Sequence, residues 1–134
     1  MRDSRQGTSH ARFIRETRGE ATTTVIAVTS CPATLDLLHH EFRYFDDVCI
    51  LHLDALGEHT TRLDFPEHCR PEQLQAPRCF LLLDEPQRIS TLAKLWPTHA
   101  LPCAQPLEQP AQALLHTVDR IKQTTRDQRR RLQA

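Results

Sequence analysis

The chain of 134 residues carries 17 basic and 17 acidic side chains, so its formal net charge at neutral pH is zero. Hydrophobic residues make up 39% of the chain and charged residues 25%, which are ordinary proportions for a folded globular domain. A zero net charge excludes a global basic field for nucleic acid, or a global acidic field for basic partners. The length corresponds to about one domain, which buries a core without disulfide or metal support.

The five cysteines and the short apolar runs set the expected compartment. No apolar run approaches the roughly 18 residues that a membrane span needs. The first twenty residues lack the apolar core of a signal peptide. An odd number of cysteines without a secretory signal favours reduced thiols. We therefore expect a cytoplasmic protein that does not contact a membrane.

The first half of the chain predicts two strands around one helix. Residues 1–21 are polar and aperiodic, and they predict a mobile arm. A β-branched, mostly apolar run over 22–28 predicts a strand buried on both faces. Apolar residues recur at helical spacing over 33–42, and a second buried strand follows over 48–53. The prolines and scattered charges of 54–77 predict loops with one short helix near its end, at 70–74.

The second half repeats the alternation of strands and helices. A continuous apolar run predicts a strand over 79–83, and a helix follows over 87–96. Residues 100–103 predict an edge strand, where proline is tolerated. The last helix is expected to begin near Pro110. This alternation predicts an α/β domain with four or five parallel strands and helices on both faces of the sheet.

The order and spacing of these segments resemble the receiver domains of two-component response regulators. Four segments match, in turn, the first strand and its helix, the phospho-acceptor strand, the fourth strand, and the fifth strand with its Lys-Pro turn: 25–32, 47–53, 77–84 and 100–108. The resemblance implies a flavodoxin-like three-layer sandwich over 22–123, followed by a basic tail over 124–134. It also implies a cis peptide bond between Gln105 and Pro106. The chain before 47–53 is too short for a further strand and helix of the family, so a four-stranded variant or an irregular second strand around 42–45 stays open.

The matching pocket departs from the pattern of an active receiver. It consists of Thr29, Ser30, His52, Asp54, Asp84 and Gln105. Thr29 and Ser30 stand where the family holds Mg²⁺ with carboxylates. His52 stands at the acceptor aspartate, and Gln105 replaces the lysine. Because phosphoryl transfer depends on neutralising the charge of the moving group, we predict a pocket that is not phosphorylated and takes no metal or cofactor.

The resemblance implies a non-catalytic regulatory or adaptor domain that binds another protein without phosphorylation, as pseudo-receivers of antitermination and transcriptional regulators do. Receivers generally signal through the fourth helix, the fifth strand and the last helix. The candidate residues on this face are Arg88, Thr91, Lys94, Trp96, Cys103 and Gln112. Trp96 is either an interface anchor or a core residue that caps its helix. A homodimer stays open.

Cys31 supports an alternative in which the protein is a phosphotransferase component. Residues 28–32 are similar to the Val-Thr-x-Cys-Pro motif of the fructose-type sugar phosphotransferase B domains, where the cysteine is phosphorylated. A thiol at a helix N-terminus has a lowered pKa and acts as a nucleophile. Against this hypothesis, no glycine follows Pro32, and Asp36 would repel an anion.

Three further alternatives concern histidines and arginines. His52 is either phosphorylated or, as we favour, a strand-end histidine bonded to Asp54 or Asp84. The arginines after residue 119 offer phosphate contacts for a nucleic-acid-associated regulator, although no aromatic side chain lies among them. The spacings of His59, His68 and Cys69 match no familiar zinc pattern, so we expect no metal site there.

Overall fold

The computed structural model describes residues 10–16, 21–53, 56–57, 59–67, 69–97, 101–106 and 111–133. The strands are β1 (His10–Arg12), β2 (Ile14–Arg15), β3 (Thr23–Val28), β4 (Val48–Leu53), β5 (Arg62–Asp64), β6 (Cys79–Leu83) and β7 (Cys103–Pro106). The α-helices are α2 (Pro32–Glu41), α3 (Ile89–Leu95) and α4 (Ala111–Gln133). Two short 3₁₀-helices, η1 (Pro71–Leu74) and η2 (Pro86–Arg88), complete the described elements.

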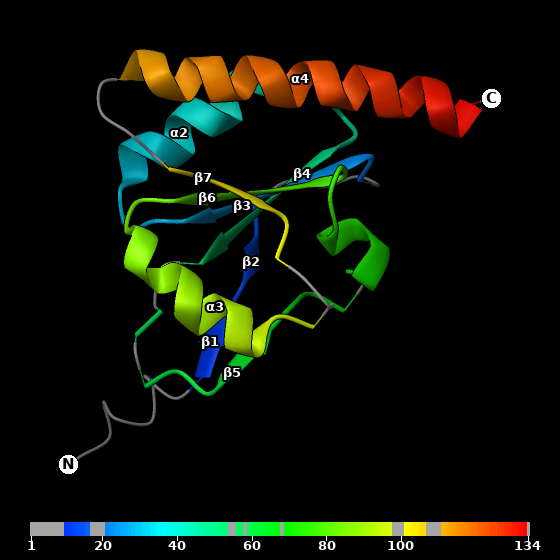
Figure 1. Ribbon diagram of the computed structural model, residues 1–134. Coiled ribbons are helices and arrows are strands. Elements are labelled where there is room, and N and C mark those ends of the chain that lie inside the picture. The colour runs from blue at the N-terminus through cyan, green and yellow to red at the C-terminus, as the bar shows by residue number, and fades with distance from the viewer. Residues whose placement is uncertain are drawn as a thin grey trace.

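The main sheet has five strands in the order β2-β4-β3-β6-β7 (Figure 1). β4, β3, β6 and β7 are parallel, and β2 lies antiparallel at the edge beside β4. All six residues of the central strand β3 are buried, which is why its run is β-branched and apolar without alternation. β1 and β5 form a separate parallel pair.

Helices cover both faces of the sheet and divide the core into two clusters. α2 and α4 lie on one face and α3 on the other (Figure 1). On the α4 side, Leu114, Val118 and Ile121 pack against alternate residues of β3 and β4, such as Val25 and Ile50. The opposite cluster joins the other set of strand residues to Leu92 and Trp96 around α3. Successive side chains of each strand point to opposite faces of the sheet, so each strand contributes residues to both core clusters.

Several sequence predictions are confirmed. The protein is an α/β domain whose sheet is mainly parallel and covered on both faces. The strands predicted over 48–53 and 79–83 have those bounds in β4 and β6. η1 falls inside the predicted 70–74 helix, and α4 begins one residue after Pro110. No helix within the described part of the chain has the length and hydropathy for crossing a membrane.

The prediction of a mobile arm is wrong for residues 10–16. They include β1 and β2, and Ala11 and Phe13 are buried in the core with the exposed Arg12 between them. The ring of Phe13 stacks on Phe65 at 4.5 Å between centroids. A segment with only two inward side chains has little apolar signal in its sequence, because its neighbours face solvent. Residues 1–9 and 17–20 of the expected arm lie outside the described residues.

The boundary predicted at residue 123 is also wrong, because α4 continues to Gln133. Thr125 and Gln128 are buried against the sheet side of this helix, although both are polar. At the other end of the sheet, the predicted strand 100–103 is shifted, since β7 begins at Cys103 and includes Gln105 and Pro106. Among the described peptide bonds, the cis bond joins Ala76 to Pro77 and not Gln105 to Pro106.

Candidate functional site

The strand order places a topological switch point beside β3. The chain leaves β3 for β4 on one side, and β6 pairs with β3 on the other side. Loops that follow such strands diverge, and ligands of open α/β sheets bind where they do so, at the carboxyl ends. Thr29, Ser30 and Cys31 follow β3 here, and Asp84 follows β6. We take this carboxyl edge as the candidate functional site.

At the carboxyl edge, a hydrogen bond between His52 of β4 and Thr29 joins β4 to the residue that follows β3. Nε2 of His52 lies 2.8 Å from the carbonyl oxygen of Thr29, and both residues are buried. Because a carbonyl only accepts, Nε2 carries the proton and donates. Nδ1 of the same ring lies 3.4 Å from a carboxylate oxygen of Glu16, which follows β2. His52 thus has the structural role that we favoured, but its partners are Thr29 and Glu16 in place of Asp54 or Asp84.

Cys31 lies at the start of α2 with an exposed side chain. Its backbone N–H donates to the hydroxyl oxygen of Thr29 at 3.0 Å, which fixes the turn between β3 and the helix. The Thr34 hydroxyl and the N–H groups of Thr34 and Ala33 lower the pKa of the Cys31 thiol by hydrogen bonding to the thiolate. The nearby carboxylate of Asp84 acts in the opposite direction. The first turn of α2 therefore favours a thiolate at its entrance.

The structure brings only part of the predicted pocket together. The backbone N–H of Asp84 donates to the carbonyl of Val28 at 3.4 Å, so Asp84 continues β6 beside Thr29. Ser30, the residue after Thr29, is exposed where the chain leaves β3. The backbone of Gln105 pairs with Leu82 inside β7, one strand beyond β6, so it is not in a turn after the strand. Asp54 lies outside the described residues.

The sequence match gave His52 the wrong place in the sheet. β4, which carries His52, pairs with β3 on the side away from β6. In a flavodoxin-like order 2-1-3-4-5, that is the place of the second strand. β6 takes the third place, and Asp84 follows it. The mistake arose because sequence patterns give the order of strands along the chain but not their neighbours in the sheet.

The residues at this edge do not fit Mg²⁺. That ion takes hard oxygen ligands in an octahedral arrangement, usually with carboxylates. The side-chain oxygen of Thr29 already accepts a bond from Cys31, and its carbonyl accepts one from His52. Within the described residues, no group of three or more His, Cys, Asp or Glu side chains is placed to hold a metal ion.

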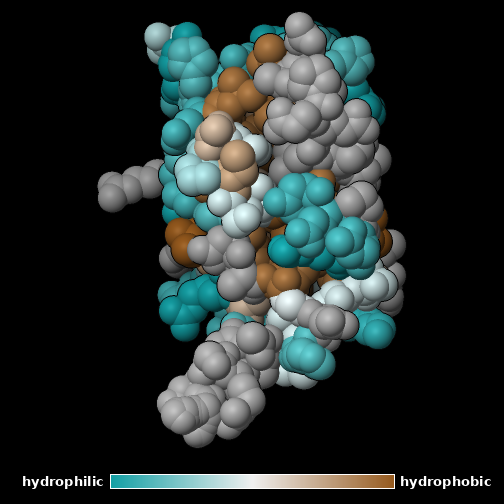
Figure 2. Space-filling model, turned by 90° about the vertical axis from the view of Figure 1, so that its left-hand side faces the viewer, coloured by the Kyte–Doolittle hydropathy of each residue, from teal (hydrophilic) through white to brown (hydrophobic). Residues whose placement is uncertain are grey.

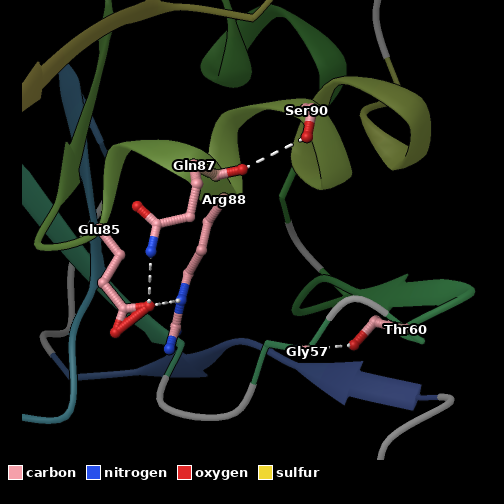
Figure 3. A network of polar contacts seen from close by, with 6 residues as sticks. All are labelled: Gly57, Thr60, Glu85, Gln87, Arg88 and Ser90. Carbon is pink, nitrogen blue, oxygen red and sulfur yellow. Dashed lines mark hydrogen bonds and ion pairs between the residues drawn. The ribbon is translucent and has the colours of Figure 1, made fainter.

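A groove of about 460 Å³ opens at the same edge, between the segment after β4 and the start of α3. Leu56 and Gly57 form one wall, and residues from Glu85 to Thr91 form the other. Figure 3 shows the carboxylate of Glu85 between the amide of Gln87 and the guanidinium of Arg88. The Arg88 Nε–Glu85 Oε2 distance is 3.0 Å. The polar wall is therefore already bonded internally.

The bonds on both walls are local. The Ser90 hydroxyl donates to the Gln87 carbonyl at 3.3 Å, and the Gly57 N–H donates to the Thr60 hydroxyl at 3.0 Å (Figure 3). Sequence reasoning predicted Arg88 and Thr91 as surface residues but missed Glu85, Gln87 and Ser90. The available signal was the Asp-Glu-Pro turn directly after a buried strand, which places polar groups at the carboxyl edge.

The predicted partner face is only partly a surface. Trp96 is 7% exposed, its indole N–H donates to the Leu74 carbonyl at 3.4 Å, and its ring meets Phe65 edge to face. The anchor hypothesis for Trp96 is therefore wrong, and the core alternative holds. Lys94 is exposed on α3 and Thr91 is half-buried. The side chains of Cys103 and Gln112 lie outside the described part.

The carboxyl edge is mixed in polarity. Figure 2 looks at the molecule from this side, and brown apolar, pale and teal polar side chains adjoin one another there. Ile89, at the first position of α3, is 37% exposed. A mixed surface of this kind suits recognition of another polypeptide better than insertion into an apolar phase.

Part of the basic charge near the C-terminus is used inside the fold. Arg126 and Arg129 lie over the ring of Phe45 at 5.5 and 5.2 Å, and Lys122 pairs with Glu41 at 3.0 Å. Arg130 and Arg131 are exposed near the end of α4. The nucleic-acid hypothesis therefore stays a prediction that depends on these exposed arginines.

No protein-family model, curated protein or solved structure matches this chain. The site must therefore be interpreted from its own geometry.

Proposed function

We propose that this protein is a non-catalytic regulatory domain of the pseudo-receiver type, which binds another protein without being phosphorylated. The spatial order β4-β3-β6-β7 corresponds to the first four places of a flavodoxin-like sheet and supports a receiver-like fold with one strand fewer. Thr29 and Ser30 at the end of β3 supply no carboxylates for Mg²⁺, which supports the lack of phosphorylation even though Asp84 follows the strand in the third place. Fold likeness alone is weak evidence of function, so the proposal depends on the surface at the carboxyl edge.

The groove between Leu56 and Thr91 is the observation that carries this proposal. Its polar wall is held in place by bonds among Glu85, Gln87 and Arg88, so its shape exists before any partner arrives. Pre-organised polar groups lower the entropy cost of binding. The described residues that line the groove include no thiol or imidazole, the usual nucleophiles and bases of enzymes. This combination favours recognition of a polypeptide over chemistry.

The test compares the partners of three tagged forms in lysate of the native cells, after nuclease treatment. The wild type is compared with Thr91→Arg, which places a long charged side chain in the groove, and with Arg130→Glu. Arg130 is a matched control because its side chain is 75% exposed on α4, which lies on the opposite face of the sheet. We expect a protein that is retained by the wild type and the control and is lost with Thr91→Arg.

Each other outcome has a defined meaning. A partner retained equally by all three forms would place the interface elsewhere. Recovery of nucleic acid alone would contradict the proposal and return weight to the arginines of α4. Concentration-dependent self-association that Thr91→Arg abolishes would assign the groove to a second copy of this chain. Addition of beryllofluoride with Mg²⁺, a phosphoryl mimic, is expected to leave partner binding unchanged.

A second candidate function rests on the exposed Cys31 thiol and its lowered pKa. A thiolate at the carboxyl edge of the central strand is placed to attack a phosphoryl group, as in the phosphocysteine domains that residues 28–32 resemble. In that case the S–P bond forms as the bond from phosphorus to the donor breaks. We expect alkylation of Cys31 to be fast below pH 7 and to be slowed by inorganic phosphate. Labelling that follows an ordinary thiol titration would exclude this function.

A further inference from the structure

A second cavity lies at the other end of the same sheet face, far from the groove in the strand direction. It has a volume of about 500 Å³, within the range of small-molecule sites. Its floor is formed by Thr24, Cys49 and Leu51 near the amino ends of β3 and β4. Its roof is formed by residues before and within η1, namely Pro66, Cys69, Arg70, Glu72 and Gln73. The cavity has no part in the proposed protein-binding function.

The charged residues around this cavity are mostly cationic. Among the described residues that line it are three arginines, Arg15 of β2, Arg70 before η1 and Arg78 before β6, and one carboxylate, Glu72. Positive charge therefore exceeds negative charge among the described lining residues. The protein as a whole is neutral, so this concentration of positive charge is local. A partly enclosed cavity with low-dielectric walls concentrates such a field and attracts anions.

Arg78 is fixed at the wall of the cavity. Its Nε donates to the carbonyl of Thr22 at 3.1 Å, and its Nη2 donates to the carbonyl of Ala21 at 2.9 Å. These bonds use two of the five N–H donors of the guanidinium and hold its plane in place. A guanidinium that is held in this way offers forked donors to an oxyanion with little further loss of entropy.

The thiols in and beside the cavity do not oppose an anion. Burial raises the pKa of the Cys69 thiol to about 11, so this thiol is neutral at physiological pH. Burial also raises the pKa of Cys79, in the register of β6 beside Thr24, above the usual range. Protonated thiols behave as small apolar groups. Together with Leu51, Ala21 and Pro66, Cys69 adds an apolar surface to the charged rim.

We propose that the cavity between the amino ends of β3 and β4 and the residues around the start of η1 binds a small organic dianion, namely a phosphate monoester with a compact apolar group. Arg70 and Arg78 contribute two guanidinium forks to the cavity, and such forks pair with phosphate oxygens in a bidentate manner. The apolar group would lie on Leu51 and its neighbours. The site differs from the carboxyl edge in both position and chemistry.

The test measures binding by isothermal titration calorimetry at low ionic strength with phenyl phosphate, inorganic phosphate, benzoate and phenol. We expect phenyl phosphate to bind several-fold more tightly than inorganic phosphate, because its ring covers the apolar floor. Phenol, which is neutral, is expected not to bind. Arg70→Gln should weaken phenyl phosphate binding about tenfold, and Glu72→Gln should strengthen it. Arg130→Gln, on the opposite face, should change neither affinity.

Amide chemical shifts locate the ligand, and thermal melts show that each variant is folded. Shift changes centred on Thr24, Cys49 and Arg70 support the proposal. The proposal is overturned if phenyl phosphate does not bind, if Arg70→Gln and Glu72→Gln both leave its affinity unchanged, or if the shifts centre on another surface. Benzoate binding as tight as that of phenyl phosphate would also overturn it, because a monoanion would then satisfy the rim. Arg70→Gln removes a positive charge and Glu72→Gln removes a negative charge, so the two variants are expected to change the affinity in opposite directions. Loss of folding by one variant therefore cannot imitate the combined result.

Discussion

Arg129 of α4 forms a two-pronged ion pair with Asp47, the residue before β4. Its Nε lies 2.6 Å from one carboxylate oxygen, and its Nη2 bonds to the other. The two residues are 82 positions apart in the chain. The ring of Phe45 lies under the same guanidinium. The pair therefore joins the C-terminal half of α4 to the amino end of the sheet.

Removing one partner of this pair is expected to destabilise the protein by about 1 kcal/mol. Arg129→Gln and Asp47→Asn should each show this loss in urea unfolding at neutral pH. The double variant should lose less than the sum, since the two residues share one interaction. Arg130→Gln is the matched control, because that side chain is largely exposed and its contact with Asp127 is 3.7 Å long. If the loss in the free energy of unfolding of the double variant equals the sum of the two single losses, the pair does not stabilise the protein.

The same pair predicts a pH dependence of stability. The hydrogen bonds from Arg129 lower the pKa of the Asp47 carboxyl in the folded protein. In the unfolded chain the carboxyl has a pKa of about 3.9. The unfolded state therefore binds the proton more tightly, and the stabilisation is complete above about pH 5 and is lost as the pH falls through the lowered value. The free energy of unfolding should fall less between pH 6 and pH 3 in Asp47→Asn than in the wild type.

Trp96→Ala is expected to reduce stability and not to act on a partner directly. The indole fills the core between η1 and α3, so its loss should cost about 3 to 5 kcal/mol. Because Trp96 is the only tryptophan, the unfolding must be followed by far-UV circular dichroism. Trp96→Phe keeps part of the ring and should lose less. A variant that unfolds at the wild-type urea concentration would place Trp96 on the surface after all.

A chain that ends at Gln123 tests the boundary that the sequence suggested. It would lack Thr125, whose hydroxyl lies 2.8 Å from both the Ile121 carbonyl and the Thr23 hydroxyl. It would also lack the buried Gln128 and the pair of Arg129 with Asp47. We expect a loss of at least about 2 kcal/mol in the free energy of unfolding. An unchanged melting temperature would show that residues 124–134 are a dispensable tail.

The elements that could be predicted from the sequence are those with long apolar runs. β3, β4 and β6 bury every residue, so their sequences identify them without help from the rest of the fold. The α/β class followed from their alternation with helices. The second half of α4 was missed because two of its buried residues, Thr125 and Gln128, are polar, and the hydroxyl of Thr125 is satisfied by hydrogen bonds. A pattern of apolar residues has no signal for a polar side chain that is satisfied inside the protein.

The candidate site could be predicted only in part, because it depends on which strands are neighbours. Thr29 and Asp84 were placed at strand ends by local patterns, and the structure brings their backbones together. The contact of His52 with Thr29 depends on the pairing of β4 with β3, which nothing in either segment specifies. The cavity rim combines Arg15, Arg70 and Arg78 from three separate segments, so no motif contains it.

The position of α4 has a consequence for the newly made protein. Every strand of the main sheet precedes this helix in the chain, yet α4 together with α2 covers one face of that sheet. Until residues 111–133 have left the ribosome and folded, Val25, Ile50 and Leu82 have only α2 to shield them. At roughly 5 to 20 residues per second, the synthesis of this helix takes seconds. We expect the nascent chain to bind chaperones that hold apolar surfaces during this interval, and a chain cut at residue 110 to aggregate.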